Sequence, residues 1–119
     1  MLIDEAYCDF NTLDDPEASV ALLARHPNLV LLRTFSKVYA LAGLRVGYAL
    51  CGSRELAEAL AHVRQPFSCN AAAAAATEAL AHPDEVRRRV QLVLAARSQL
   101  QAGLRELGLV PADSQLLLV

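Results

Sequence analysis

A short apolar run that leads directly into hydroxyl and basic side chains restricts the fold of this chain more than any other feature. The run spans residues 29–32 (Leu-Val-Leu-Leu); Thr34, Ser36 and Lys37 follow it, and Arg45 comes eight residues after the lysine. Such a run with turn-forming residues behind it predicts a buried strand. Because α/β proteins bind ligands at the carboxyl ends of strands, we expect Lys37 at such an edge. There its amine could bond a carbonyl compound, and Arg45 with the two hydroxyls could bind a phosphate.

Strand-like and helix-like segments alternate in the first half of the chain. We expect strands at residues 2–3, 28–32 and 46–51, and helices at residues 18–24 and 55–63. Ser53 precedes the second helix, in the position where serine often caps a helix. This alternation predicts an α/β fold with a parallel sheet and right-handed crossovers.

The second half of the chain reads as helical. Residues 70–81 are rich in alanine, and Ser68 or Asn70 is expected to cap that helix. Pro83 and the acids after it then open an amphipathic helix of about 24 residues, or about 36 Å, that ends at Gly108. The arginine run at residues 87–89 reads as its solvated face, and residues 115–119 read as a further strand.

Composition and charge exclude several classes of function. The 119 residues carry a net charge of −2, which gives no electrostatic case for binding nucleic acid or an anionic membrane. No apolar stretch approaches the roughly 20 residues that span a bilayer. Cys8, Cys51 and Cys69 lack paired spacing in the sequence. No histidine follows or precedes a cysteine at the spacing of metal ligands, so we predict no disulfide and no metal site. A cytoplasmic protein is expected, and both chain ends read as cut within strands.

Two separated motifs resemble the fold-type I pyridoxal-phosphate aminotransferases. They are Asp4-Glu5-Ala6-Tyr7 and Thr34-Phe35-Ser36-Lys37 with Gly43-Leu44-Arg45-Val46-Gly47-Tyr48. Within that group, residues 26–30, 33–37 and 41–45 most resemble the histidinol-phosphate aminotransferases, and the resemblance covers essentially the whole chain. It implies that residues 1–82 are part of the cofactor-binding large domain. Residues 83–108 would then be a long helix between two lobes, and residues 109–119 the beginning of a truncated small domain.

The resemblance also implies a role for each motif residue. Lys37 would bond the cofactor aldehyde covalently and later move a proton between substrate and cofactor. Asp4 would keep the pyridine nitrogen of pyridoxal 5′-phosphate protonated, and Tyr7 would donate a hydrogen bond to the phenolic oxygen.

The phosphate of the cofactor would be held by the second motif. Arg45 would clamp it through its planar guanidinium, and Ser36 and Thr34 would add hydroxyl donors. Gly43 and Gly47 would let the backbone approach closely around this clamp. The local alternatives are a solvated lysine, an Asp4 that caps loop amides, a half-buried Tyr7 and a Thr34 that caps a strand end.

The implied activity is transfer of an amino group between an amino acid and a 2-oxo acid, with histidinol phosphate and 2-oxoglutarate as the favoured pair. The intact enzyme would be a homodimer with sites at the subunit interface. Three alternatives stay open: a threonine-phosphate decarboxylase or aromatic aminotransferase relative, a catalytically inactive gene remnant, and a nucleotide-binding α/β module. The last lacks any Gly-x-Gly-x-x-Gly stretch. Family segments that complete the site lie outside this chain, so the chain alone is expected to be inactive.

Overall fold

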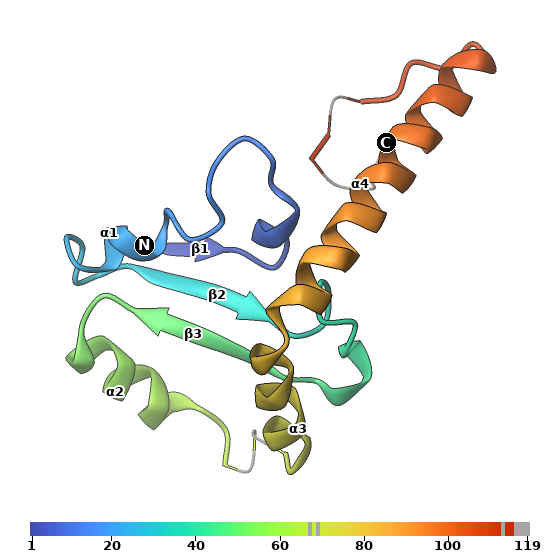
Figure 1. The fold of residues 1–119 in the computed structure, drawn as a ribbon. Helices are drawn as coiled ribbons and strands as arrows, with labels where there is room; N and C mark the ends of the chain where they lie inside the picture. Colours follow the sequence, from blue (N-terminus) through green and yellow to red (C-terminus); the bar gives the residue numbers. More distant parts are fainter. Residues whose placement is uncertain (67, 69, 113, 116–119) are drawn as a thin grey trace.

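Three short strands form one sheet in the computed structural model, which describes residues 1–66, 68, 70–112 and 114–115. The order across the sheet is β1 (Leu2–Asp4), β2 (Val30–Thr34) and β3 (Gly47–Cys51), with β2 in the centre (Figure 1). β1 and β2 run parallel with Asp4 opposite Leu32, and helix α1 (Val20–Leu23) lies in the connection between them. This arrangement belongs to the α/β class that the sequence predicted.

The orientation of β3 corrects one prediction. β3 runs antiparallel to β2, with Gly47 opposite Thr34 and Cys51 opposite Val30. A parallel neighbour would need a crossover connection, usually a helix that crosses the face of the sheet. The connection of residues 35–46 holds only the 3-10 helix η2 (Ala42–Leu44), so the chain folds back at the end of β2. The mostly parallel α/β sheet expected from the sequence therefore includes β3 as an antiparallel strand, which the alternation of strands and helices did not indicate.

The core lies under β2 and the loop that follows it. Leu29 and Leu31 are fully buried, and beyond the strand Phe35 and Val38 are 3% and 2% exposed. The Phe35 ring packs at 5.0 Å from the Tyr39 ring and at 5.6 Å from the Tyr48 ring, within the range of favourable aromatic pairs. The loop after β2 is consequently anchored by apolar side chains on both sides of Ser36 and Lys37.

The helices begin and end close to the predicted bounds. Helix α2 (Arg54–Val63) starts at Ser53, whose Oγ accepts the Leu56 N–H at 3.2 Å, so the predicted cap is confirmed. The other helical elements are η1 (Cys8–Phe10), α3 (Ala72–Glu78), η3 (Ala79–Ala81) and α4 (Pro83–Glu106). Within the described residues, no helix combines the length and the apolar character needed to cross a membrane.

Helix α4 sets the length of the molecule. Its 24 residues span roughly 36 Å, and the whole chain measures 53 × 32 × 26 Å. The first turns of α4 lie beside the sheet and the last turns extend beyond it (Figure 1). The chain then returns along the helix, where Gln101 Nε2 donates to the Ala112 carbonyl at 3.4 Å. The strand predicted at residues 115–119 falls almost entirely outside the described residues, and the division into lobes stays a prediction.

Candidate functional site

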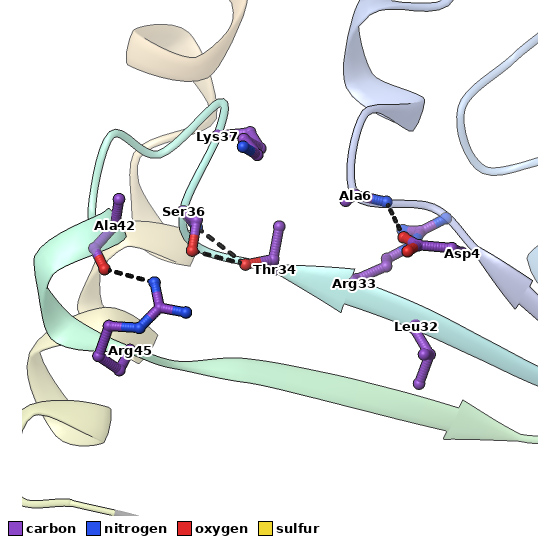
Figure 2. A pocket seen from close by; sticks show the side chains of 9 residues that line it. All are labelled: Asp4, Ala6, Leu32, Arg33, Thr34, Ser36, Lys37, Ala42 and Arg45. Carbon is purple, nitrogen blue, oxygen red and sulfur yellow. Dashed lines mark hydrogen bonds between the residues drawn. The ribbon is translucent and has the colours of Figure 1, made fainter.

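A cavity of about 380 Å³ opens where β1 and β2 end. Its lining comprises Asp4, Ala6, Leu32, Arg33, Thr34, Ser36, Lys37, Ala42 and Arg45 (Figure 2). Ligand pockets in proteins commonly have volumes of roughly 300–1,000 Å³, so this cavity has room for a small molecule. Five of the six residues predicted for the site line it; the sixth, Tyr7, lies beside it.

The two hydroxyls of the motif are joined at the end of β2. Thr34 Oγ1 donates to Ser36 Oγ at 2.9 Å and accepts the Ser36 N–H at 3.0 Å. A threonine that accepts a backbone N–H two residues on closes a tight local turn. The strand-end capping that was the alternative for Thr34 is therefore present, and it brings both hydroxyls to the cavity, with Ser36 directly before Lys37.

Lys37 stands out from this turn because its neighbours are held inward. Phe35 and Val38 are buried, whereas Lys37 is exposed at the cavity. Its Nζ lies 4.9 Å from the centroid of the Tyr7 ring, a distance at which an ammonium group is attracted to an aromatic face. The loop after β1 thus brings Tyr7 to the lysine.

Asp4 ends β1 and lines the cavity from the side opposite Arg45. Its Oδ1 accepts the Ala6 N–H at 3.0 Å, so the local capping considered above is present. In Figure 2, Asp4 and Arg45 lie on opposite sides of the Thr34 and Ser36 hydroxyls. The cavity therefore has an acidic end and a basic end, with the hydroxyl groups between them.

The turn that carries Arg45 is held by its neighbours. Arg45 has a left-handed backbone with φ of 54°, and its Nη1 donates to the Ala42 carbonyl at 2.9 Å. Asn70 Nδ2 donates to the Leu44 carbonyl at 2.8 Å, while Asn70 Oδ1 accepts the Ala72 N–H at 2.9 Å. Asn70 thus accepts the N–H of the first α3 residue, although the N-cap position of α3 is Ala71, and the same side chain also fixes the turn before Arg45.

Of the two glycines expected near the clamp, only one is at a close approach. A Cβ on Gly47 would lie 2.9 Å from the Arg33 carbonyl oxygen, closer than such atoms normally come. A Cβ on Gly43 would meet no atom within 4 Å. Gly47 is therefore required where β3 pairs with the end of β2, and the steric argument does not extend to Gly43.

Sequence reasoning missed the pairing of Arg33 with Glu5. Arg33 Nε donates to Glu5 Oε2 at 2.9 Å, and the two side chains are only 10% and 8% exposed. Burial acts to lower the pKa of Arg33, but hydrogen bonds to Glu17 and Glu5 outweigh it and raise that pKa. The parallel register held a signal: Asp4 stands opposite Leu32, so the next residues of the two strands, Glu5 and Arg33, are neighbours.

The arginine run on α4 is only partly solvated, which corrects the prediction. The side chains of Arg87 and Arg88 are 69% and 61% exposed, whereas that of Arg89 is 35% exposed. Arg89 Nη1 donates to the Tyr39 carbonyl at 2.5 Å. Arg89 therefore ties α4 to the loop that carries Lys37.

The cysteines of the described residues are free. Burial raises the pKa of the half-buried Cys8 to about 11, and the charge of Asp9 adds to this effect. Cys51 is half-buried as well. Among the described residues, no group of three or more histidine, cysteine or acidic side chains could hold a metal ion.

Comparison with known proteins places these features in a family context. The family model described as aminotransferase class I and II matches residues 1–119. A histidinol-phosphate aminotransferase from Thermococcus kodakarensis is 43% identical over 120 residues, which cover 100% of this chain and 34% of that protein. An aromatic amino acid aminotransferase from a Mycobacterium species (strain JLS) is 42% identical, covering 97% of this chain and 32% of that protein.

A solved structure resembles the fold as well. It is the crystal structure of histidinol-phosphate aminotransferase from Sinorhizobium meliloti in complex with pyridoxal-5′-phosphate. The TM-score is 0.85 at 33% identity, and the match covers 97% of this chain and 31% of that one. The chain thus spans about a third of the length of the relatives it matches.

Proposed function

Because the chain belongs to the aminotransferase class I and II family, we propose that the protein carrying it transfers amino groups with pyridoxal 5′-phosphate as cofactor. One observation carries the proposal: an amine, two hydroxyls, a guanidinium and a carboxylate converge on a single cavity of about 380 Å³. The Sinorhizobium meliloti relative, of similar fold, holds this cofactor.

The side chains around the cavity fit the chemical groups of that cofactor. A guanidinium and hydroxyls suit phosphate oxygens, so Arg45, Ser36 and Thr34 would bind the phosphate. The Asp4 carboxylate, at the opposite end, would hold a proton on the ring nitrogen. When bound, the cofactor supplies an electron sink for substrate carbanions.

The remaining steps belong to the chain's own residues. Lys37 Nζ would hold the cofactor through its aldehyde carbon until an amino acid replaces it. The freed amine would then carry a proton away from the substrate α-carbon. The Tyr7 ring, 4.9 Å from Lys37 Nζ, would orient the amine, and its hydroxyl would donate to the phenolic oxygen of the cofactor.

For the substrates, we propose histidinol phosphate as amino donor and 2-oxoglutarate as acceptor, which is a step in histidine biosynthesis. Support comes from the relatives named histidinol-phosphate aminotransferase at 43% and 33% identity. The aromatic amino acid aminotransferase at 42% identity favours a second candidate, transfer from aromatic amino acids. A homodimer, which the family resemblance implies, and a cytoplasmic location, which the composition favours, complete the proposal.

The test is a comparison of amino donors. The protein that carries this chain, supplied with pyridoxal phosphate and 2-oxoglutarate, is assayed for glutamate with histidinol phosphate, phenylalanine and tyrosine as donors. We expect the highest kcat/KM with histidinol phosphate and no turnover by Lys37→Ala. A higher kcat/KM with phenylalanine or tyrosine would select the aromatic candidate. No turnover with any of the three donors would contradict both candidates and favour the inactive remnant.

A further inference from the structure

The most enclosed ion pair among the described residues stands directly behind the cavity. The side chains of Arg33 and Glu5 are 10% and 8% exposed. In every other ion pair of the described residues, at least one of the two side chains is 35% exposed or more. Glu5 follows Asp4, and Arg33 precedes Thr34. The pair therefore joins the ends of the two strands that supply the acidic end and the hydroxyls of the cavity.

The Arg33 guanidinium connects three segments of the chain. Its Nε bonds Glu5 at 2.9 Å, its Nη1 bonds Glu17 at 2.7 Å, and its Nη2 donates to the Pro16 carbonyl at 2.9 Å. The backbone adds a bond from the Glu5 N–H to the Leu32 carbonyl at 2.8 Å. Each of the three guanidinium nitrogens thus donates to a partner, so a shift of Arg33 toward a ligand would break at least one of these bonds.

A second cavity lies against the same pair. It measures about 300 Å³ and is bordered by Glu5, Asp9 and Glu17 among other residues. Arg33 and Thr34 line both cavities, so the end of β2 forms the wall between them. The Glu5–Arg33 pair therefore lies at the wall between the two cavities, beside the backbone bond that joins Glu5 to Leu32.

A buried ion pair contributes little net stability, because desolvation of the two charges offsets their attraction. Its value lies in fixed geometry. We propose that the Glu5–Arg33 pair is a positioning device that sets the separation between Asp4 and the Thr34 and Ser36 hydroxyls. On the proposed function, this is the separation between the ring-nitrogen end and the phosphate end of the cofactor. The inference rests on that function and adds two positioning residues to it.

The direct test replaces Glu5 by glutamine and compares it with a matched change on the same guanidinium. Glu5→Gln keeps the size of the side chain and removes the buried charge. Glu17→Gln makes the same chemical change at the partner that is 66% exposed. Both variants are made in the full protein that carries this chain. For each, the dissociation constant of pyridoxal phosphate and the visible circular dichroism of the bound cofactor are measured, together with the unfolding temperature.

We expect Glu5→Gln to weaken cofactor binding by about 10-fold to 100-fold, since a displacement of about 1 Å can cost that much in a positioned site. The circular dichroism of the cofactor should change with it, because the ring no longer has a fixed partner at its nitrogen. Glu17→Gln should stay within about twofold of the parent, given the small contribution of exposed ion pairs. A role in stability alone would lower the unfolding temperature and leave the cofactor spectrum unchanged.

The outcomes separate the two proposals. A parent that binds no pyridoxal phosphate refutes the proposed function, and this inference with it. A parent that binds, with Glu5→Gln and Glu17→Gln indistinguishable in affinity and spectrum, refutes the positioning role alone. If Glu5→Gln does not fold, Glu5→Asp, which keeps the charge on a shorter side chain, is measured in the same way and should also bind more weakly. Failure of both variants to fold would make the pair a folding determinant and overturn the inference.

Discussion

Replacement of Thr34 by valine tests how the turn at the cavity is held. Valine keeps the shape of threonine but removes Oγ1, which makes hydrogen bonds of 2.9 Å and 3.0 Å to Ser36 and a longer one of 3.5 Å to the Val46 carbonyl. A protein hydrogen bond contributes about 1 kcal/mol net. The loss of two short bonds therefore predicts a decrease of about 2 kcal/mol in the free energy of unfolding. Because Thr34 is only half-buried and water can replace a partner, we expect a value closer to about 1 kcal/mol.

The same change should weaken cofactor binding, because the Ser36 hydroxyl loses its orientation and the phosphate loses a donor. A hydrogen bond to a charged group contributes about 1.5–3 kcal/mol, so we expect the dissociation constant of pyridoxal phosphate to rise about 10-fold to 100-fold. Urea unfolding and absorbance titration measure the two effects, with Thr34→Ser as the control that keeps the hydroxyl. The reasoning is refuted if Thr34→Val binds like the parent, or if Thr34→Ser is impaired as severely.

Three further predictions concern stability. Leu31→Ala should lower the free energy of unfolding by about 2–5 kcal/mol in urea titration, because a fully buried side chain leaves a cavity, while the exposed Leu13→Ala should change it by less than about 0.5 kcal/mol. Arg89→Leu should lower the free energy of unfolding by about 1 kcal/mol, because the bond to the Tyr39 carbonyl is lost. Arg88 is more exposed, so Arg88→Leu should lower it by less, and equal decreases would contradict this assignment. Cys8 has a pKa of about 11 in the fold against 9.0 for a free thiol, so the folded state holds its proton more tightly. Its contribution to stability should be full below about pH 9 and decline as the pH rises toward 11, a decline that Cys8→Ser should lack.

The sequence was most informative where local chemistry and packing agree. The apolar run before Thr34 is a buried central strand, and the hydroxyls after it form the turn that presents Lys37. The proline and two acids at residues 83–85 predicted the start of the long helix, and α4 begins at Pro83. These features depend on neighbours in the sequence, and periodicity and capping rules describe such neighbours well.

Features that depend on partners distant in the sequence were harder to predict. The reversal of β3 arises from a loop with no crossover helix, and alternation alone does not reveal that reversal. Glu5 and Arg33 are 28 residues apart, and each reads as an ordinary surface charge until the strand register is known. Arg89 looked like one of three solvated arginines, since nothing local indicates that Tyr39 lies against that helix face.

The most direct test of the central claim is chemical labelling of Lys37. Lys37 is the only lysine of this sequence, which simplifies the assignment. The protein that carries this chain is mixed with pyridoxal phosphate, reduced with borohydride, digested and mapped by mass spectrometry. The account predicts a pyridoxyl group on Lys37 and no label on this segment in Lys37→Arg. A folded protein that gains no adduct on Lys37 would contradict it.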